Sequence, residues 1–212
     1  MHIKRDHITI MLLCALSGVI DVLGYIGLSH VFTANMTGNI VLLGIGIGDA
    51  RQAVLSNAAI ALAGFVIGIA ATVLVQKKNG TSRSILFWEF ILFLFVAAMI
   101  LLMPIGEVLS SVILLLLSTA MGMQTIAGRN LKIAGLSSTV LTSTLAAFVE
   151  GLMGKTRKPS LDTYLRGAAI LLYLLGAAAG SFSERIIGLN TIWLGVVLLA
   201  IILLIQRKPT HQ

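Results

Sequence analysis

Six long apolar stretches, separated by short charged segments, constrain the fold of this chain most. Each one approaches the roughly 20 residues that a helix needs to cross a bilayer. Hydrocarbon offers no hydrogen-bond partner to the backbone, so such stretches must satisfy their own amides as helices. With 58% hydrophobic and only 11% charged residues, a soluble domain is excluded, and residues 1–212 are expected to form one transmembrane domain. The expected spans are Ile8–Ser29, Ala53–Val75, Ser84–Met103, Val108–Ala127, Leu161–Phe182 and Leu189–Ile205.

Two further apolar pieces, Thr33–Gly48 and Ser137–Met153, are short for a crossing, and the basic residues decide how they are treated. Six crossings with a cytoplasmic amino end leave only Arg51 and Arg185 outside, so 13 of the 15 Lys and Arg residues lie inside. Eight crossings would split the same 15 residues 9 against 6. Cytoplasmic loops of membrane proteins are enriched in Lys and Arg, which favours six crossings, two short broken or re-entrant helices and both termini in the cytoplasm. The net charge of +7 therefore reports orientation, and no nucleic-acid partner is expected.

Polar residues interrupt the apolar pattern at two places. The run Thr33-Ala34-Asn35-Met36-Thr37-Gly38-Asn39 follows the first span, and a fainter copy at 138–144 follows the fourth. Broken backbone at membrane depth persists only where it is buried in protein or lines a cavity. These two runs therefore predict an internal site.

The two halves of the chain echo each other. Gly18, Asp21 and Gly24 precede the first polar run, and Gly122, Thr125 and Gly128 precede the second. We expect two repeats of three crossings each, at about 8–104 and 108–206. Because three is an odd number, the second repeat enters the membrane from the side opposite to the first. Such inverted repeats place the amino ends of broken helices at a midplane site in many transporters. Each half also carries a Gly-x-x-x-Gly pair, which allows close helix packing either within the chain or in a homo-oligomer.

Asp21 lies near the middle of the first span. A carboxyl at that depth must be protonated, held by the N–H and hydroxyl donors of the 33–39 segment, or paired with a transported cation. Two roles remain open for it: proton coupling, or a structural role beside the broken backbone. A second acid, Glu89, lies in the first turn of its span near Arg83. We expect its long side chain to reach the inner membrane surface.

The run Phe32-Thr33-Ala34-Asn35-Met36-Thr37-Gly38-Asn39 after Gly18-x-x-Asp21, with Met121-Gly122-Met123-Gln124 ahead of Thr139 and Thr142, resembles the YoaK family. This is a family of uncharacterised bacterial multi-pass inner-membrane proteins, a domain of unknown function. The resemblance spans essentially the whole chain and implies location and helix number, but no activity. Ser143 stands where the family pattern has glycine, which weakens the mapping onto the second half.

A small-solute secondary transporter or channel-like carrier is the leading functional hypothesis, with a midplane site and proton coupling through Asp21. The alternative is a non-transporting structural, lipid-interacting or regulatory membrane protein. An enzyme is not expected because no catalytic constellation shares a face. Neither a cofactor nor a metal is expected, since His2, His7, His30 and His211 lack ligand spacing. The candidate substrate or coupling residues are Asp21, Thr33, Asn35, Thr37, Gly38, Asn39, Gln124, Thr139, Thr142 and Thr144.

Overall fold

The computed structural model describes residues 4–76, 81–131, 141–154 and 159–207. These residues form helices joined by short connections and contain no strand, which confirms the predicted all-α class for the described part of the chain. In chain order the elements are α1 (Arg5–Val22), the π-helix η1 (Leu23–Ser29), α2 (Met36–Gly48), α3 (Gln52–Gln76), α4 (Ser82–Leu102), α5 (Glu107–Asn130), α6 (Leu141–Met153), α7 (Leu161–Ile187), the 3₁₀ turn η2 (Gly188–Thr191) and α8 (Ile192–Ile205).

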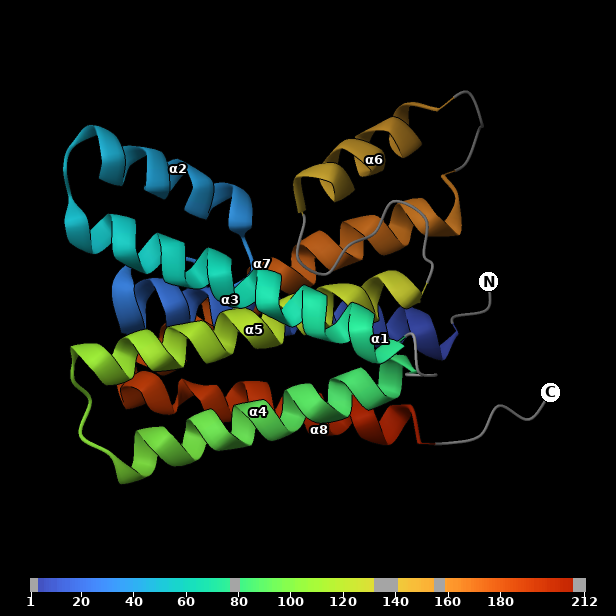
Figure 1. Ribbon diagram of the computed structural model, residues 1–212. Helices are drawn as coiled ribbons and strands as arrows, with labels where there is room; N and C mark the ends of the chain where they lie inside the picture. Colours follow the sequence, from blue (N-terminus) through green and yellow to red (C-terminus); the bar gives the residue numbers. More distant parts are fainter. Residues whose placement is uncertain (1–3, 77–80, 132–140, 155–158, 208–212) are drawn as a thin grey trace.

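Five helical segments of the described chain are long and apolar enough to cross a membrane. The longest, Leu161–Ile205, contains both α7 and α8, which run in opposite directions in Figure 1. In contrast, α2 and α6 have 13 residues each. At 1.5 Å per residue they are about 20 Å long, well below the roughly 30 Å hydrocarbon core. In the described residues both predicted short pieces are thus short apolar helices. The first of them begins at Met36 and not at Thr33, because Thr33–Asn35 precede the helix.

The two short helices lie on the same flank of the bundle, α2 against α3 and α6 against α7 (Figure 1). Both begin in the middle of the bundle. From there α2 runs toward the end where α3 begins, and α6 runs toward the opposite end, where α1 begins and α8 finishes (Figure 1). Their amino ends therefore face each other near the middle of the bundle's length.

Glycines bring two pairs of long helices to backbone contact. A side chain at Gly18 of α1 would collide with the backbone at Tyr173 of α7, and one at Gly122 of α5 would collide with Phe65 of α3. The Gly-x-x-x-Gly pairs lie at the same two interfaces, Gly64 and Gly68 against α5 and Gly176 and Gly180 against α1. Small residues of this kind allow close van der Waals packing of membrane helices. These four glycines are thus used within the chain, and oligomerisation stays a prediction.

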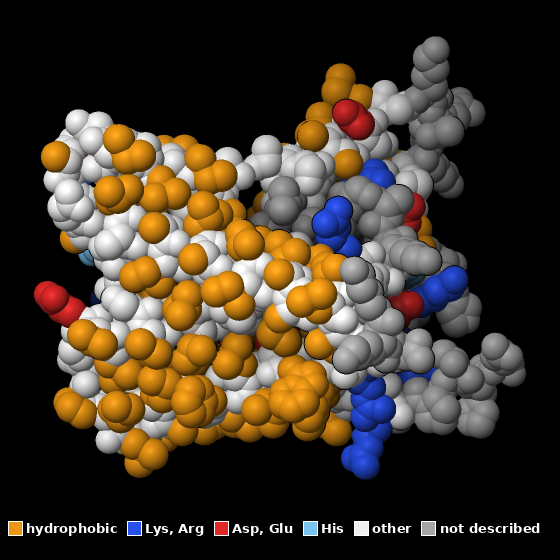
Figure 2. All heavy atoms as spheres, in the orientation of Figure 1, with side chains coloured by type: hydrophobic (Ala, Val, Ile, Leu, Met, Phe, Trp, Pro, Cys, Tyr) orange, Lys and Arg blue, Asp and Glu red, His pale blue; other side chains and the backbone are white. Residues whose placement is uncertain are grey.

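The surface agrees with a membrane location. Large hydrophobic side chains are exposed along the sides of the bundle, and Lys and Arg gather at the end where α1 begins (Figure 2). The described cations at that end are Lys4, Arg5, Arg83, Arg129, Arg166 and Arg207, with Arg51 and Arg185 at the other end.

The expectation for Glu89 is wrong. This side chain is fully buried and neither carboxyl oxygen has a hydrogen-bond partner. The reason is its helix face: Leu86 and Phe93, one turn to either side of Glu89 along α4, are also fully buried. That face packs toward α5 and α8 and not toward the membrane surface.

Candidate functional site

The site is built around a reversal of the chain after the first long helix. α1 widens into the π-helix η1 and ends at His30, which adopts the left-handed conformation with φ 55°. The chain then returns to the middle of the bundle before α2 begins. π-Helical turns are frequent at functional sites, but no feature of the apolar pattern in the sequence predicts this one.

Asp21 holds the returning segment. Its Oδ1 accepts hydrogen bonds from the amide of Thr33 (2.8 Å), the hydroxyl of Thr33 (3.1 Å) and the amide of Ala34 (2.7 Å). Its Oδ2 accepts from the hydroxyl of Tyr173 on α7 (2.6 Å). All four contacts are donations to the carboxyl group, the pattern that suits an ionised carboxylate. Of the three states left open by the sequence, the geometry matches the one in which donors hold Asp21.

Asn39 fixes the other end of the same segment. Its side chain accepts from the Phe32 amide (2.9 Å) and donates to the Phe32 carbonyl (2.6 Å). Asn35 caps α2 by accepting from the Gly38 amide (3.3 Å). These contacts satisfy backbone groups that would otherwise be unpaired within the membrane. The polar run therefore serves first to stabilise its own irregular backbone.

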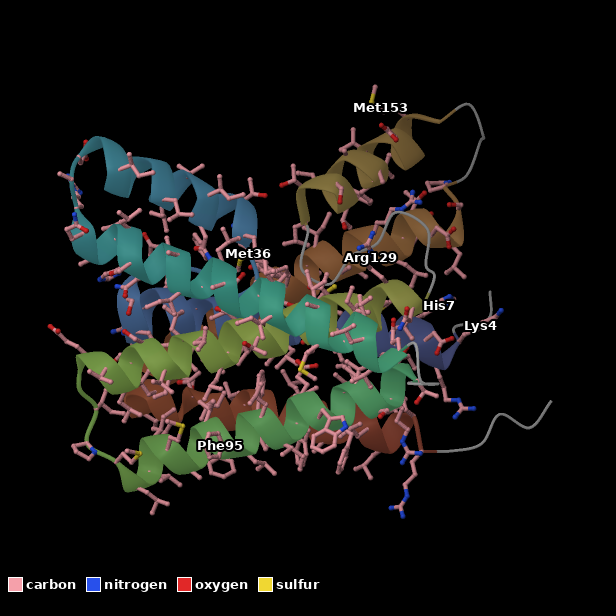
Figure 3. The ribbon with its side chains drawn as sticks, in the orientation of Figure 1. Lys4, His7, Met36, Phe95, Arg129 and Met153 are labelled. Atoms are coloured by element: carbon pink, nitrogen blue, oxygen red, sulfur yellow. The ribbon has the colours of Figure 1, made fainter. Side chains whose placement is uncertain are left out.

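A cavity of about 260 Å³ lies where the amino ends of α2 and α6 meet. Figure 3 marks Met36, at the start of α2, in the middle of the bundle, and Met153, at the far end of α6, near one of its ends. Thr37 of α2 and Thr142 of α6 both line the cavity, as do Phe65 of α3 and Tyr173 of α7. Its remaining lining residues are Ala34, Asn35, Met36, Thr125 and Leu141. Within the described residues, hydroxyl, amide and aromatic groups line the cavity, and no charged side chain does.

The predicted site residues separate into two groups. Asn35, Thr37 and Thr142 line the cavity, and their role in binding stays a prediction. The other predicted residues do not line the cavity. Asp21, Thr33 and Asn39 make the hydrogen bonds described above, Gly38 packs against the ring of Phe32, and Thr144 is fully buried. Gln124 donates to the Leu13 carbonyl (3.2 Å) and the Ser17 hydroxyl (2.7 Å), away from the cavity. Thr139 lies outside the described residues.

Tyr173 is the main residue that the sequence reasoning missed. It connects the cavity to Asp21, although 152 residues separate the two in the chain. Tyrosines of membrane helices are enriched at the interfaces, and Tyr173 lies near the middle of α7. The mid-span position of Tyr173 could therefore have marked it as a candidate site residue from the sequence.

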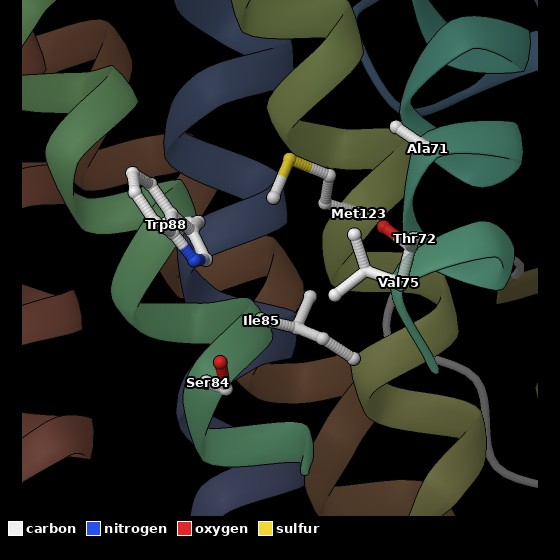
Figure 4. A pocket seen from close by; sticks show the side chains of 7 residues that line it. All are labelled: Ala71, Thr72, Val75, Ser84, Ile85, Trp88 and Met123. Carbon is white, nitrogen blue, oxygen red and sulfur yellow. The ribbon is translucent and has the colours of Figure 1, made fainter. Parts of the chain in front are cut away.

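Two other hollows have different chemistry. One, of about 140 Å³, is lined by apolar side chains, apart from two hydroxyl residues, between α3, α4 and α5 (Figure 4). Its residues are Ala71, Thr72, Val75, Ser84, Ile85, Trp88 and Met123. The other, of about 720 Å³, lies at the end where α3 and α5 begin and is lined largely by Ser, Gln and Asn. Its polar lining suits a water-filled depression open to one side of the membrane.

Comparison with known proteins gives one family. Residues 9–205 match the family model described as "Protein of unknown function (DUF1275)". The chain is 43% identical over 201 residues to the UPF0700 transmembrane protein YoaK of Bacillus subtilis (strain 168), covering 89% of this chain and 88% of that protein. No solved structure matches the chain.

Proposed function

This chain belongs to the DUF1275 family of multi-pass membrane proteins, and we propose that it is a small-solute secondary transporter or channel-like carrier. The observation that carries this proposal is the cavity between the facing amino ends of α2 and α6. Short helices that begin at mid-membrane and run to opposite sides are how many secondary transporters build their substrate site. A fully packed centre would have argued against transport.

The proposed topology has six crossings (α1 with η1, α3, α4, α5, α7 and α8) in two inverted repeats. Its support is the pairing of helices: α1 packs on α7 as α5 packs on α3, and α6 lies on α7 as α2 lies on α3. The glycine contacts repeat too, because Gly68 of the first half meets Thr119 of the second as Gly176 of the second half meets Ala15 of the first. The gathering of cations at one end supports cytoplasmic termini in a bacterial inner membrane.

The cavity would favour a small solute rich in hydrogen-bond acceptors. The amino end of a helix carries a partial positive charge of roughly half an elementary charge, and two such ends face this cavity. In the described part of the chain the Thr37 amide has no hydrogen-bond acceptor, whereas the Gly38 and Asn39 amides are taken up by Asn35. The volume suits a small anion or a carbonyl-bearing metabolite, since drug-sized pockets reach about 300–1,000 Å³.

The second candidate is a non-transporting structural, lipid-interacting or regulatory protein. It is favoured by the internal use of Asp21, Thr33 and Asn39, which satisfy the broken backbone and do not enter the cavity. Under that candidate the cavity binds nothing. The two candidates therefore differ in one measurable property, a solute that binds and crosses.

The test combines ligand binding with flux. Purified protein is screened by thermal shift against small anions and carboxylates, because a ligand that prefers the folded state raises the apparent stability. Hits are then followed as radiolabelled counterflow in proteoliposomes. Thr37→Val and Thr142→Val each remove one cavity hydroxyl and should weaken binding about 5- to 10-fold, as expected for one hydrogen bond of about 1 kcal/mol. Thr119→Val, which loses only a bond to the Leu115 carbonyl of its own helix, is the matched control. Unchanged binding and unchanged flux in both cavity variants would contradict the proposal.

A further inference from the structure

We propose that Glu89 is a proton-binding site within the membrane, held in the structure as a neutral carboxylic acid, and that Asp21 is not. Applied to transport, this assigns proton coupling to Glu89, a role that rests on the proposed function. The protonation itself does not depend on transport.

The first step is the contrast between the two buried acids. Asp21 is 3% exposed and accepts four hydrogen bonds, two of them from backbone amides. Glu89 is 0% exposed, and both of its oxygens lack a partner. A buried charge without a partner is so costly that the group takes the neutral form instead. The donor set of Asp21, by contrast, stabilises its charged form.

The second step is the electrostatic surroundings of Glu89. α4 packs against α5, α8 and η2. α8 and η2 carry no ionisable side chain, and α5 carries only Glu107 and Arg129, at its two ends. Arg83, in the first turn of α4, is exposed. Both Glu89 oxygens lack a partner, so no cation among the described residues holds Glu89 as an anion.

The third step is depth. Glu89 lies about 10 Å along α4 from Ser82, given 1.5 Å per residue. This places it inside the hydrocarbon layer, on the half that faces the cation-rich end of the bundle (Figures 1 and 2). Ionisable residues inside membranes that face the bundle interior mark ion and proton pathways. When water reaches α4 the carboxyl O–H gives its proton to that water and leaves a carboxylate, and uptake reverses the step.

Infrared spectroscopy of the full chain in phosphatidylcholine liposomes tests this directly. At neutral pH exposed carboxyls are ionised, so a protonated-acid C=O band should come from one buried group. The band should shift to lower frequency when the protein is made with carboxyl-¹³C glutamate, because Asp21 is an aspartate and the other three glutamates, Glu107, Glu150 and Glu184, are exposed or partly exposed. It should disappear in Glu89→Gln and persist in Asp21→Asn and in the control Glu107→Gln.

Three results would overturn the assignment: no such band in the natural protein, a band that ignores the glutamate label, or a band that survives Glu89→Gln. If Glu89→Gln fails to fold, the label experiment is repeated in Glu184→Gln, where the remaining glutamates besides Glu89 are exposed, and Glu89→Asp should restore a band insensitive to the label. Flux without a protonated Glu89 would remove only this inference. A protonated Glu89 without ligand binding or flux would remove only the transport proposal.

Discussion

Asp21→Ala should destabilise the protein strongly, because it removes the acceptor for two buried backbone amides. The Thr33 and Ala34 amides donate to Asp21 at 2.8 and 2.7 Å, and both residues are buried. Each buried donor left without a partner costs about 1–3 kcal/mol. The two amides together predict a loss of about 2–6 kcal/mol in the free energy of unfolding.

Asp21→Asn should cost less than Asp21→Ala. The asparagine carbonyl can keep the position of Oδ1 and still accept from the two amides, so these bonds lose only their charge assistance. The Tyr173 hydroxyl loses its acceptor but can accept a hydrogen bond from the asparagine nitrogen instead. Charged hydrogen bonds contribute about 1.5–3 kcal/mol and neutral ones about 0.5–1.5. Because the bonds to Oδ1 keep both donor and acceptor, the loss of free energy of unfolding should stay below that of Asp21→Ala.

The assay is reversible unfolding in mixed detergent micelles, with amide hydrogen exchange of residues 31–35 as a local readout. Exchange at Thr33 and Ala34 should accelerate in Asp21→Ala and stay slow in Asp21→Asn. Asp6→Ala is the matched control, since Asp6 is exposed in the first turn of the same helix and should cost less than about 1 kcal/mol. An Asp21→Ala protein as stable as Asp6→Ala, with unchanged exchange, would refute the reasoning.

Three further changes test neighbouring features. Gly68→Ala and Gly176→Ala drive a methyl into the carbonyls of Thr119 and Ala15 and should each lower the free energy of unfolding by about 1–3 kcal/mol or more by overpacking. The control Gly44→Ala, whose methyl would meet nothing within 4 Å, should be neutral or stabilising by up to about 1 kcal/mol. Equal melting temperatures for all three variants would contradict the packing. Asn39→Ala removes both contacts to the Phe32 backbone and should lower the free energy of unfolding by about 1–3 kcal/mol, whereas Asn57→Ala, in the polar depression at one end of the bundle, should change it by less than about 0.5.

Much of the fold follows from apolar length. Each of the six expected spans falls on a helical segment, the last two within the segment Leu161–Ile205, because hydrocarbon allows the backbone no other choice. Thr37 and Thr142, each taken from one of the two polar runs, both line the cavity. Local sequence is sufficient where the membrane itself is the constraint.

The remaining features depend on tertiary contacts that local sequence does not reveal. Glu89 lies within reach of the surface by its position along the chain, and only the packing of α4 shows that it faces inward. Tyr173 meets Asp21 because Gly18 lets α1 and α7 approach at that level. The polar side chains of the first run were predicted to face a solute, but most are used by the broken backbone beside them. A polar residue next to a break can satisfy either the backbone or a ligand, and its type does not say which.

Sided thiol labelling tests the central claim that the two short helices leave the midplane toward opposite faces. Gly48→Cys and Met153→Cys mark their outer ends; both positions are exposed, and a side chain at Gly48 meets nothing within 4 Å. Cys14 is buried and is replaced by alanine in the background. A membrane-impermeant maleimide applied outside cells with a permeabilised outer membrane should label residue 48 at once and residue 153 only after the inner membrane is opened. Labelling of both residues from the same face would contradict the inverted arrangement.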